Sequence, residues 1–311
     1  NNNNKILNVP NLRFPEFTGE WKKCKLGDVA NLTKGVGISK GQKSSKGNPC
    51  ILYGELYTTY KSEMITDIVS KTNIDSANLA KSKYNDVIIP SSGETAIDIS
   101  TARCVQYNDV LLGGDLNIIR LNDGNDGSFF SYQLNGVRKR DIAKVAQGVS
   151  VVHLYGENLK AIKVNSPELA EQNKISSLLC LIDQRISTQN KIIEDFKKLM
   201  SAIYQNVFYR NEASFVSLGD ICSIVKGQQL NGDSLSKNGD YYVMNGGVSP
   251  SGYYSAYNNE PNTISISEGG NSCGYVQFNN ERFWSSGHCY SLKNIISDTN
   301  PIYLYNYLKY R

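Results

Sequence analysis

Residues 26–35 read LGDVANLTKG, and residues 218–227 read LGDICSIVKG. Five of the ten positions are identical without a gap, and two more exchange one aliphatic side chain for another. The same offset of 192 residues pairs Tyr53-Gly54 with Asn245-Gly246. Self-similarity at a fixed offset is the sequence signature of an internal duplication, so we predict two modules of similar fold.

The resemblance continues, with gaps, through the next part of each copy. Residues 86–93 (DVIIPSSG) resemble residues 263–270 (TISISEGG), and residues 112–116 (LGGDL) resemble residues 285–289 (SSGHC). Short apolar runs between Gly, Ser and Asn turns are typical of β-strands. We therefore expect strands at residues 86–90, 117–121, 263–267 and 275–278.

Tyrosine is frequent in both copies, and the second copy contains Tyr241, Tyr242, Tyr253, Tyr254 and Tyr257. Two interpretations fit these side chains. They are ordinary sheet residues, or they are polar-tipped aromatics that line a binding face. The sequence leaves both open.

A long helix is predicted between the copies. Ser166 is the expected N-cap, Pro167 is the expected first helical residue, and acidic residues follow in the first turn. Neither Gly nor Pro occurs between residues 168 and 210. Apolar side chains recur there in alternating steps of four and three, interrupted only at Gln189; they are Ile175, Leu179, Ile182, Ile186, Ile193, Phe196, Met200, Ile203 and Val207. This pattern is typical of a coiled-coil seam.

A seam of this length predicts a partner helix. About 40 helical residues would span roughly 60 Å. The duplication places the second helix after the second copy, but the sequence reaches Arg311 without one. We therefore expect the antiparallel partner helix to be missing from this chain, and the chain to be cut or truncated. Gln189 is expected either to fix the register with the partner or to face water.

The predicted fold class is α+β, with two mixed α/β domains joined by the long helix. The expected boundaries are an N-terminal segment at 1–20, a first domain at 21–165, a spacer helix at 166–210 and a second domain, incomplete at its C-terminus, at 211–311.

Composition indicates a globular protein, because 40% of the residues are hydrophobic and 20% are charged. No run of about 18 apolar residues and no signal peptide is visible, so no membrane association is expected. The seven cysteines are scattered and odd in number, which favours free thiols in a reducing compartment, the bacterial cytoplasm. Residues 1–165 hold 21 Lys and Arg against 16 Asp and Glu, which is weakly compatible with a polyanionic partner.

The sequence offers no convincing catalytic motif. The nearest match to the target-amine motif of an adenine methyltransferase is Asn300-Pro-Ile-Tyr303, which is better explained as the start of a helix. Glu20-Trp-Lys22 lacks the acidic partner that a nuclease needs to hold Mg²⁺, and no phosphate-binding loop for ATP is present. The only histidines are His153 and His288. We therefore predict a protein that is not an enzyme, with no catalytic residue and no metal site.

Several further segments, in this order, carry a resemblance to a known family. They are Leu12–Trp21 (LRFPEFTGEW), Lys25–Asp28 (KLGD), Gly148–Leu154 (GVSVVHL), Leu159–Val164 (LKAIKV), Pro167–Ile175 (PELAEQNKI) and Val216–Asp220 (VSLGD). On these residues the chain resembles the DNA-specificity subunit of type I restriction-modification systems, over nearly its whole length.

The resemblance implies an architecture and a set of partners. Two target-recognition domains, held apart by two antiparallel helices, would each read one half of a bipartite site on double-stranded DNA. Two methyltransferase (modification) subunits, which bind S-adenosylmethionine, and two restriction (endonuclease and translocase) subunits, which use ATP and Mg²⁺, would dock on this scaffold. The chain itself would need no cofactor.

Candidate DNA contacts follow from residue type and not from the resemblance, because recognition domains differ between targets. Exposed cations in flexible loops neutralise phosphates, and hydrogen-bonding side chains in loops read bases. In the first domain the cations are Lys34, Lys40, Lys43, Lys46, Arg138, Lys139 and Arg140. The base-reading candidates there are Ser91, Ser92, Glu94, Arg103, Gln147, Ser150 and His153. In the second domain the candidates are Lys226, Gln228, Gln229, Asn245, Ser249, Glu268, Asn271 and His288.

Other functions remain open at the level of sequence. The chain could be the recognition part of a fused methyltransferase-nuclease, or a coiled-coil adaptor or inactive phage-borne remnant. It could also be a truncated half-type subunit that dimerises to read a symmetric site.

Overall fold

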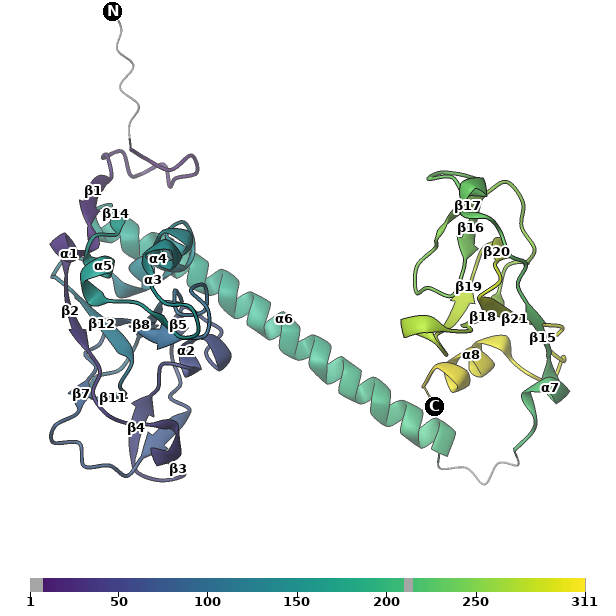
Figure 1. The fold of residues 1–311 in the computed structure, drawn as a ribbon, viewed down its shortest axis with the longest axis horizontal. Coiled ribbons are helices and arrows are strands. Elements are labelled where there is room, and N and C mark those ends of the chain that lie inside the picture. Colours follow the sequence, from purple (N-terminus) through teal and green to yellow (C-terminus); the bar gives the residue numbers. More distant parts are fainter. Residues whose placement is uncertain (1–7, 210–214, 311) are drawn as a thin grey trace, which may run out of the picture. The chain divides into compact units, whose positions relative to one another are not determined.

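The computed structural model describes residues 8–209 and 215–310 (Figure 1). It has the predicted α+β fold, with two sheet-based domains and one long helix, α6 (Leu169–Tyr209). The chain divides into two compact units between Lys191 and Ile192. The first part of α6 therefore belongs to one unit and its last part belongs to the other.

The first domain is organised around a five-stranded sheet. Its strands, in spatial order, are β2 (Ala30–Lys34), β12 (Leu116–Leu121), β8 (Val87–Pro90), β10 (Arg103–Val105) and β5 (Met64–Ile65). All four residues of the central strand β8 are apolar and buried. Because side chains alternate across a strand, Val87 and Ile89 pack into one core while Ile88 packs into another. The sheet is therefore covered on both faces.

Different layers cover the two faces. Helices cover one of them, with Phe130, Ile142 and Leu159 in its core; they are α3 (Gly127–Asn135), α4 (Lys139–Val145) and α5 (Gly156–Lys160). A second sheet covers the other, with α2 (Glu55–Thr58) and the 3-10 turn Lys40–Gln42 beside it. In spatial order its strands are β3 (Lys43–Ser44), β6 (Ser70–Thr72), β4 (Asn48–Ile51), β11 (Leu111–Leu112) and β7 (Ala80–Lys81). Two strand pairs complete the domain: β1 (Lys22–Lys25) with β14 (Lys163–Ser166), and β9 (Ser92–Gly93) with β13 (Val152–His153).

The long helix begins later than predicted. Ser166 is not its N-cap: it is the last residue of β14, where pairing with Lys22 of β1 holds it in extended conformation. The first helical hydrogen bond instead runs from the Gln172 amide to the Glu168 carbonyl, at 3.0 Å. Tertiary pairing thus overrides a local capping signal.

The N-terminal segment anchors the start of α6. Arg13 donates two hydrogen bonds of 2.6 Å to the carboxylate of Glu171, which is fully buried. The Lys174 ammonium lies 4.7 Å from the centre of the Phe14 ring. Part of the Leu12–Trp21 motif therefore holds the helix against the first domain.

The predicted seam lies on α6 with its apolar side chains exposed. Ile175 packs against the first core, but the seven seam residues from Ile182 to Val207 are all exposed. Leu181, Ile192 and Leu199 widen the same apolar surface. Large apolar side chains exposed along a whole helix are typical of a partner-binding surface.

The second domain contains a shorter version of the first. Its larger sheet has, in order, β15 (Ser223–Lys226), β21 (Cys289–Lys293), β18 (Thr263–Ser267) and β19 (Val276–Asn279). Its smaller sheet has β17 (Gly252–Tyr254), β16 (Tyr241–Met244) and β20 (Phe283–Ser285). The helical elements are α7 (Leu218–Ile221), α8 (Pro301–Tyr310) and the 3-10 turns Gly232–Ser234 and Gly270–Ser272.

Topology confirms the duplication. The order β15-β21-β18-β19 repeats the order β2-β12-β8-β10. Each copy opens with a one-turn helix, α1 (Leu26–Val29) or α7, whose Asp28 or Asp220 accepts a hydrogen bond from the residue before the helix. The predicted strands correspond to β8, β12, β18 and β19 within one residue at each end.

The glycine that ends the repeated sequence has the same role in both copies. A Cβ on Gly35 would lie 1.9 Å from the Gly113 carbonyl oxygen, and a Cβ on Gly227 would lie 2.1 Å from the Ser286 carbonyl oxygen. No other residue allows the two backbone segments to approach so closely. This contact joins the LGD repeat to residues 112–116 and 285–289, as the alignment of the copies requires.

Candidate nucleic-acid interface

Four of the candidate residues in the second domain meet at one end of its larger sheet. Lys226 ends β15, Glu268 follows β18, and His288 precedes β21. The Lys226 ammonium lies 2.6 Å from Oε1 of Glu268, and Nδ1 of His288 lies 3.6 Å from Oε2 of the same carboxylate. The His288 amide donates to Oδ1 of Asn245 at 3.4 Å. We call Lys226, Glu268, His288 and Tyr290 the strand-end cluster.

The pairing of β21 with both neighbours builds this cluster. Tyr290 of β21 is opposite Lys226 on one side and opposite Ile266 on the other. Its hydroxyl donates to Oε1 of Glu268 at 2.9 Å. A hydrogen bond from Lys226, and to a smaller extent one from Tyr290, lowers the pKa of the Glu268 carboxyl below its ordinary value, so it is ionised at neutral pH.

The sequence did not single out Tyr290. The only sequence feature that distinguishes Tyr290 is a difference between the copies: in their alignment it takes the place of Asn117. Tyr290 positions the Glu268 carboxylate, and such a supporting residue belongs to no recognisable sequence motif.

The other candidates of the second domain lie on nearby loops. Gln228 and Gln229 follow β15; the Gln228 amide donates to the Ser285 carbonyl at 2.9 Å, and both side chains are exposed. Ser249 and Asn271 are also exposed, in the loop after β16 and in the turn after β18. In the part of the chain that the structure describes, neither Ser249 nor Asn271 forms a hydrogen bond or ion pair with the strand-end cluster, so their role remains a prediction.

The tyrosines of the second domain pack mostly against one another and their neighbours. Tyr242 stacks on Phe283 at 5.5 Å, Tyr254 contacts Trp284 at 5.2 Å, and Tyr241 contacts Tyr257 at 4.9 Å. These contacts favour the interpretation as sheet residues.

In the first domain, a hairpin gathers several candidates. Ser92 on β9 is opposite His153 on β13, and the Gln147 and His153 backbones exchange two hydrogen bonds. The His153 ring stacks on Tyr155 at 6.2 Å. Gln147, Ser150 and His153 are exposed at this hairpin, and Glu94 is exposed in the loop after β9. Ser91 and Ser92 are buried, which argues against direct base contact by their side chains.

Arg103 is a structural residue. It is 7% exposed, and its guanidinium donates to the carbonyl oxygens of Leu56 at 3.0 Å and Tyr60 at 2.8 Å. Glu63 lies 3.7 Å away as its counter-ion. Because its N–H groups are directed into the protein, the Arg103 guanidinium cannot donate two hydrogen bonds to a base, so the structure argues against the predicted contact.

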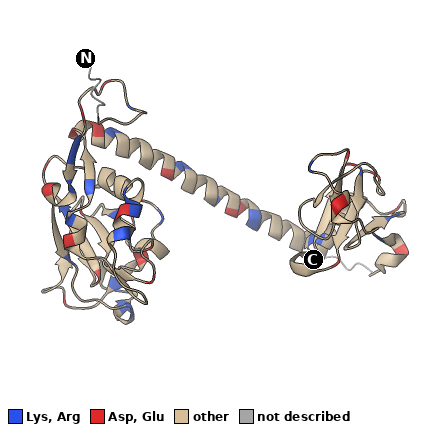
Figure 2. Ribbon diagram, turned by 45° about the horizontal axis from the view of Figure 1, so that its top comes forward, with Lys and Arg blue, Asp and Glu red and all other residues tan. Residues whose placement is uncertain are grey.

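The cationic candidates divide into paired and unpaired groups. Lys43 binds the buried Glu55 at 2.7 Å and Arg138 binds Asp141 at 3.3 Å, while Lys139 donates to a Thr101 hydroxyl. The remaining candidates are exposed, and in the part of the chain that the structure describes they have no carboxylate within 4.0 Å; they are Lys34, Lys40, Lys46 and Arg140. Figure 2 shows lysine and arginine on many elements of the first domain.

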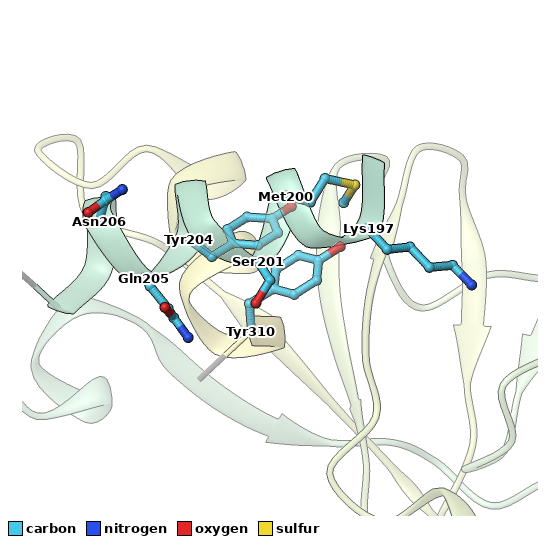
Figure 3. A pocket seen from close by; sticks show the side chains of 7 residues that line it. All are labelled: Lys197, Met200, Ser201, Tyr204, Gln205, Asn206 and Tyr310. Carbon is cyan, nitrogen blue, oxygen red and sulfur yellow. The ribbon is translucent and has the colours of Figure 1, made fainter. Parts of the chain in front are cut away.

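The described linings of two hollows in the second unit contain none of that domain's candidate residues. One, of about 780 Å³, is lined by the end of α6 and by Tyr310, whose ring stacks on Tyr204 at 3.7 Å (Figure 3). Among the described residues that line it, Lys197 alone is charged. Among residues 8–209 and 215–310 no group of His, Cys, Asp and Glu could hold a metal ion, and no helix is long and apolar enough to cross a membrane. All seven cysteines are free thiols.

Comparison with known proteins gives one family. The family described as "Type I restriction modification DNA specificity domain" matches residues 18–198 and, separately, residues 211–311. Each of its two matches contains one of the two structural copies, and the first also includes part of α6.

Individual relatives agree. Over 65% of its length the chain is 22% identical to a putative type I specificity subunit of Mycoplasma genitalium, and it spans 61% of that protein. A crystal structure of a type I restriction-modification S subunit from M. genitalium has a TM-score of 0.67 at 20% identity, covering 94% of this chain and 77% of that one. A second solved structure, described as the basis of complex assembly and conformational transition of the type I R-M system, has a TM-score of 0.50 at 17% identity. The match covers 93% of this chain and 79% of that one. At such identities the structures support the fold alone.

Proposed function

Because the chain belongs to the family of type I restriction modification DNA specificity domains, we propose that it directs a type I complex to a bipartite DNA target, with each domain reading one half. The observation that carries this proposal is the double family match, which falls on two copies of one fold. One copy is sufficient to read a short sequence, so two copies in one chain predict two half-sites.

The two copies share a framework but differ in their loops. Lys34 and Lys226 occupy matching strand ends, and Gly35 and Gly227 make the same backbone contact. The loops around them carry different side chains, so the two half-sites are expected to differ in sequence. Unpaired cations such as Lys40 and Lys46 would bind phosphates, which orients the DNA without selecting its sequence.

The exposed seam of α6 supports a second element of the proposal. In this role α6 pairs antiparallel with another helix through Ile182–Val207. Burial of seven exposed apolar side chains is a sufficient driving force, at about 25 cal/mol per Å² of apolar surface. The helix pair then acts as a spacer between the half-sites.

Catalysis belongs, in this proposal, to the partners. Two modification subunits bind S-adenosylmethionine and methylate the DNA, and two restriction subunits use ATP and Mg²⁺. The chain contributes recognition and assembly in the bacterial cytoplasm. The support is the family assignment and the similarity in fold to a structure described as the basis of complex assembly in the type I R-M system.

Methylation mapping tests the proposal. The subunit and its modification subunit are expressed together in a host without DNA methylation, and modified bases are located across the genome. The expected result is one motif with two specified blocks separated by unspecified bases. Absence of modified sites, or a motif with one contiguous block, would contradict the proposal.

A further inference from the structure

The two copies place different side chains at one shared backbone position. The Ser91 amide donates to the Asp115 carbonyl at 2.7 Å, and the Glu268 amide donates to the His288 carbonyl at 3.0 Å. The same hydrogen bond in both copies makes Ser91 equivalent to Glu268. Ser91 is buried, whereas the Glu268 side chain is 27% exposed beside Lys226. The backbone at this position is therefore the same in both domains, but the side chain that it carries differs.

The Glu268 carboxylate is held on one side and open on the other. Its Oε1 accepts hydrogen bonds from Lys226 at 2.6 Å and Tyr290 at 2.9 Å. Among the described residues, no hydrogen bond is donated to its Oε2, and Nδ1 of His288 lies 3.6 Å from it, which is beyond hydrogen-bond distance. An ionised carboxylate is purely an acceptor, so Oε2 offers lone pairs to an incoming donor.

The surrounding charges suit DNA. A bare carboxylate near a phosphate backbone is repelled, but the Lys226 ammonium pairs with Glu268 and offsets its charge. Lys34 occupies the position of Lys226 in the other copy, so the cation is common to both domains while the carboxylate is not. A shared cation fits a contact common to both half-sites, and a group present in one copy fits a contact that selects a base.

We propose that Glu268 reads one base pair of the second domain's half-site by accepting a hydrogen bond, in the major groove, from the exocyclic amine of cytosine or adenine. This inference rests on the proposed function. Acidic side chains accept from cytosine N4 in known protein–DNA complexes, and adenine N6 presents the same donor. A guanine or thymine carbonyl at that place would face the carboxylate without a proton between them, which disfavours the reversed base pair.

Substitution by glutamine tests the assignment. Glu268→Gln keeps the shape but adds an amide donor, so it tolerates a carbonyl as well as an amine. The experiment maps methylation by the whole subunit with its modification subunit. We expect one position of one half-site to lose about tenfold or more of its base preference. All other positions should stay unchanged. The relaxed position itself shows whether the amine belongs to cytosine or to adenine.

A matched control lies at the other end of β18. Glu260 is also paired with a cation, Arg282, at 3.0 Å, and it precedes the strand that Glu268 follows. Glu260→Gln removes the same charge from the same domain and should leave the motif unchanged. If both substitutions relax the same position, a general charge effect explains the result and the proposal is wrong.

A second variant separates reading from stability. Lys226→Met removes the same ion pair but keeps the carboxylate, so methylation should weaken at every site while base preference is retained.

The proposal also fails if Glu268→Gln folds and methylates the unchanged motif. If Glu268→Gln does not fold, Glu268→Asp replaces it: methylation should fall with the motif intact, and unchanged methylation would overturn the proposal. If the wild-type complex methylates nothing, the proposed function is wrong and this inference fails with it.

Discussion

Charged residues of one type have opposite environments in this protein, and burial decides what each does. Arg103 is buried among carbonyl groups with Glu63 beside it, whereas Arg140 is exposed on α4. The sequence predicted a DNA contact for both, because the residue type was the only signal. The carbonyl groups that engage Arg103 come from residues more than 40 positions away, and no local pattern reveals them.

Stability measurements should separate these two arginines. Arg103→Ala leaves Glu63 without its counter-ion and two carbonyls without a donor, so the free energy of unfolding should fall by about 3 kcal/mol. Arg140→Ala should change it by less than about 0.5 kcal/mol. Urea denaturation of the two variants measures both values. Equal stability of the variants would show that Arg103 is not a structural residue.

Thiol reactivity should follow burial. Burial raises the pKa of the Cys104 thiol to about 12, so at pH 8 almost none of it is the reactive thiolate. Cys273 is exposed. A thiol reagent at pH 8 should therefore label Cys273 within the native protein and Cys104 only after unfolding. Mass spectrometry of the labelled peptides measures the order, and early labelling of Cys104 would contradict the packing of the first core.

At the scale of secondary-structure elements, the sequence was informative where the pattern was local. The runs of β8 and β18 and the seam of α6 follow directly from residue order. The start of α6 could not be predicted, because pairing with β1 draws Ser166 into a strand. Likewise, neither the hairpin of His153 nor the strand-end cluster is visible before the strands are paired.

The glycine contact of each copy should be sensitive to one methyl group. Gly227→Ala places a Cβ against the Ser286 carbonyl, and overpacking of this kind costs about 1–3 kcal/mol. Gly219 lies in α7 with nothing within 4 Å of an added Cβ, so Gly219→Ala is the control and should be neutral. Thermal unfolding of both variants tests this. Similar midpoints would mean that the close approach does not stabilise the domain.

The seam of α6 should control assembly and not domain stability. Replacing Phe196 and Ile203 by Gln removes two exposed apolar side chains and should weaken the pairing of α6 with a second helix, which should lower the yield of the complex that the helix pair supports with the modification subunit. Lys191→Gln, on the same helix but outside the seam, should assemble as the wild type does. Size-exclusion chromatography with light scattering measures the complex. Unchanged assembly of the double variant would exclude the seam as an interface.

At the scale of the whole molecule, each domain should act independently in recognition. Exchange of residues 21–165 for the first domain of another specificity subunit should change one half of the methylated motif and leave the other half unchanged. The reason is that the two copies have separate cores and separate sheets. Methylation mapping of the chimera measures the result. A motif altered in both halves would show that the domains read DNA jointly.

Ser91 and Glu268 each donate an equivalent backbone hydrogen bond in their own domain, and this affects how the protein evolves. It joins peptide groups, which every residue except proline can donate, so the scaffold does not depend on the side chain carried there. At Glu268, whose side chain is partly exposed, a point mutation therefore keeps this backbone hydrogen bond, whereas the buried Ser91 accepts only a small side chain. Under the proposed function, substitutions at Glu268 therefore change the DNA target one base pair at a time while the framework of the domain is kept.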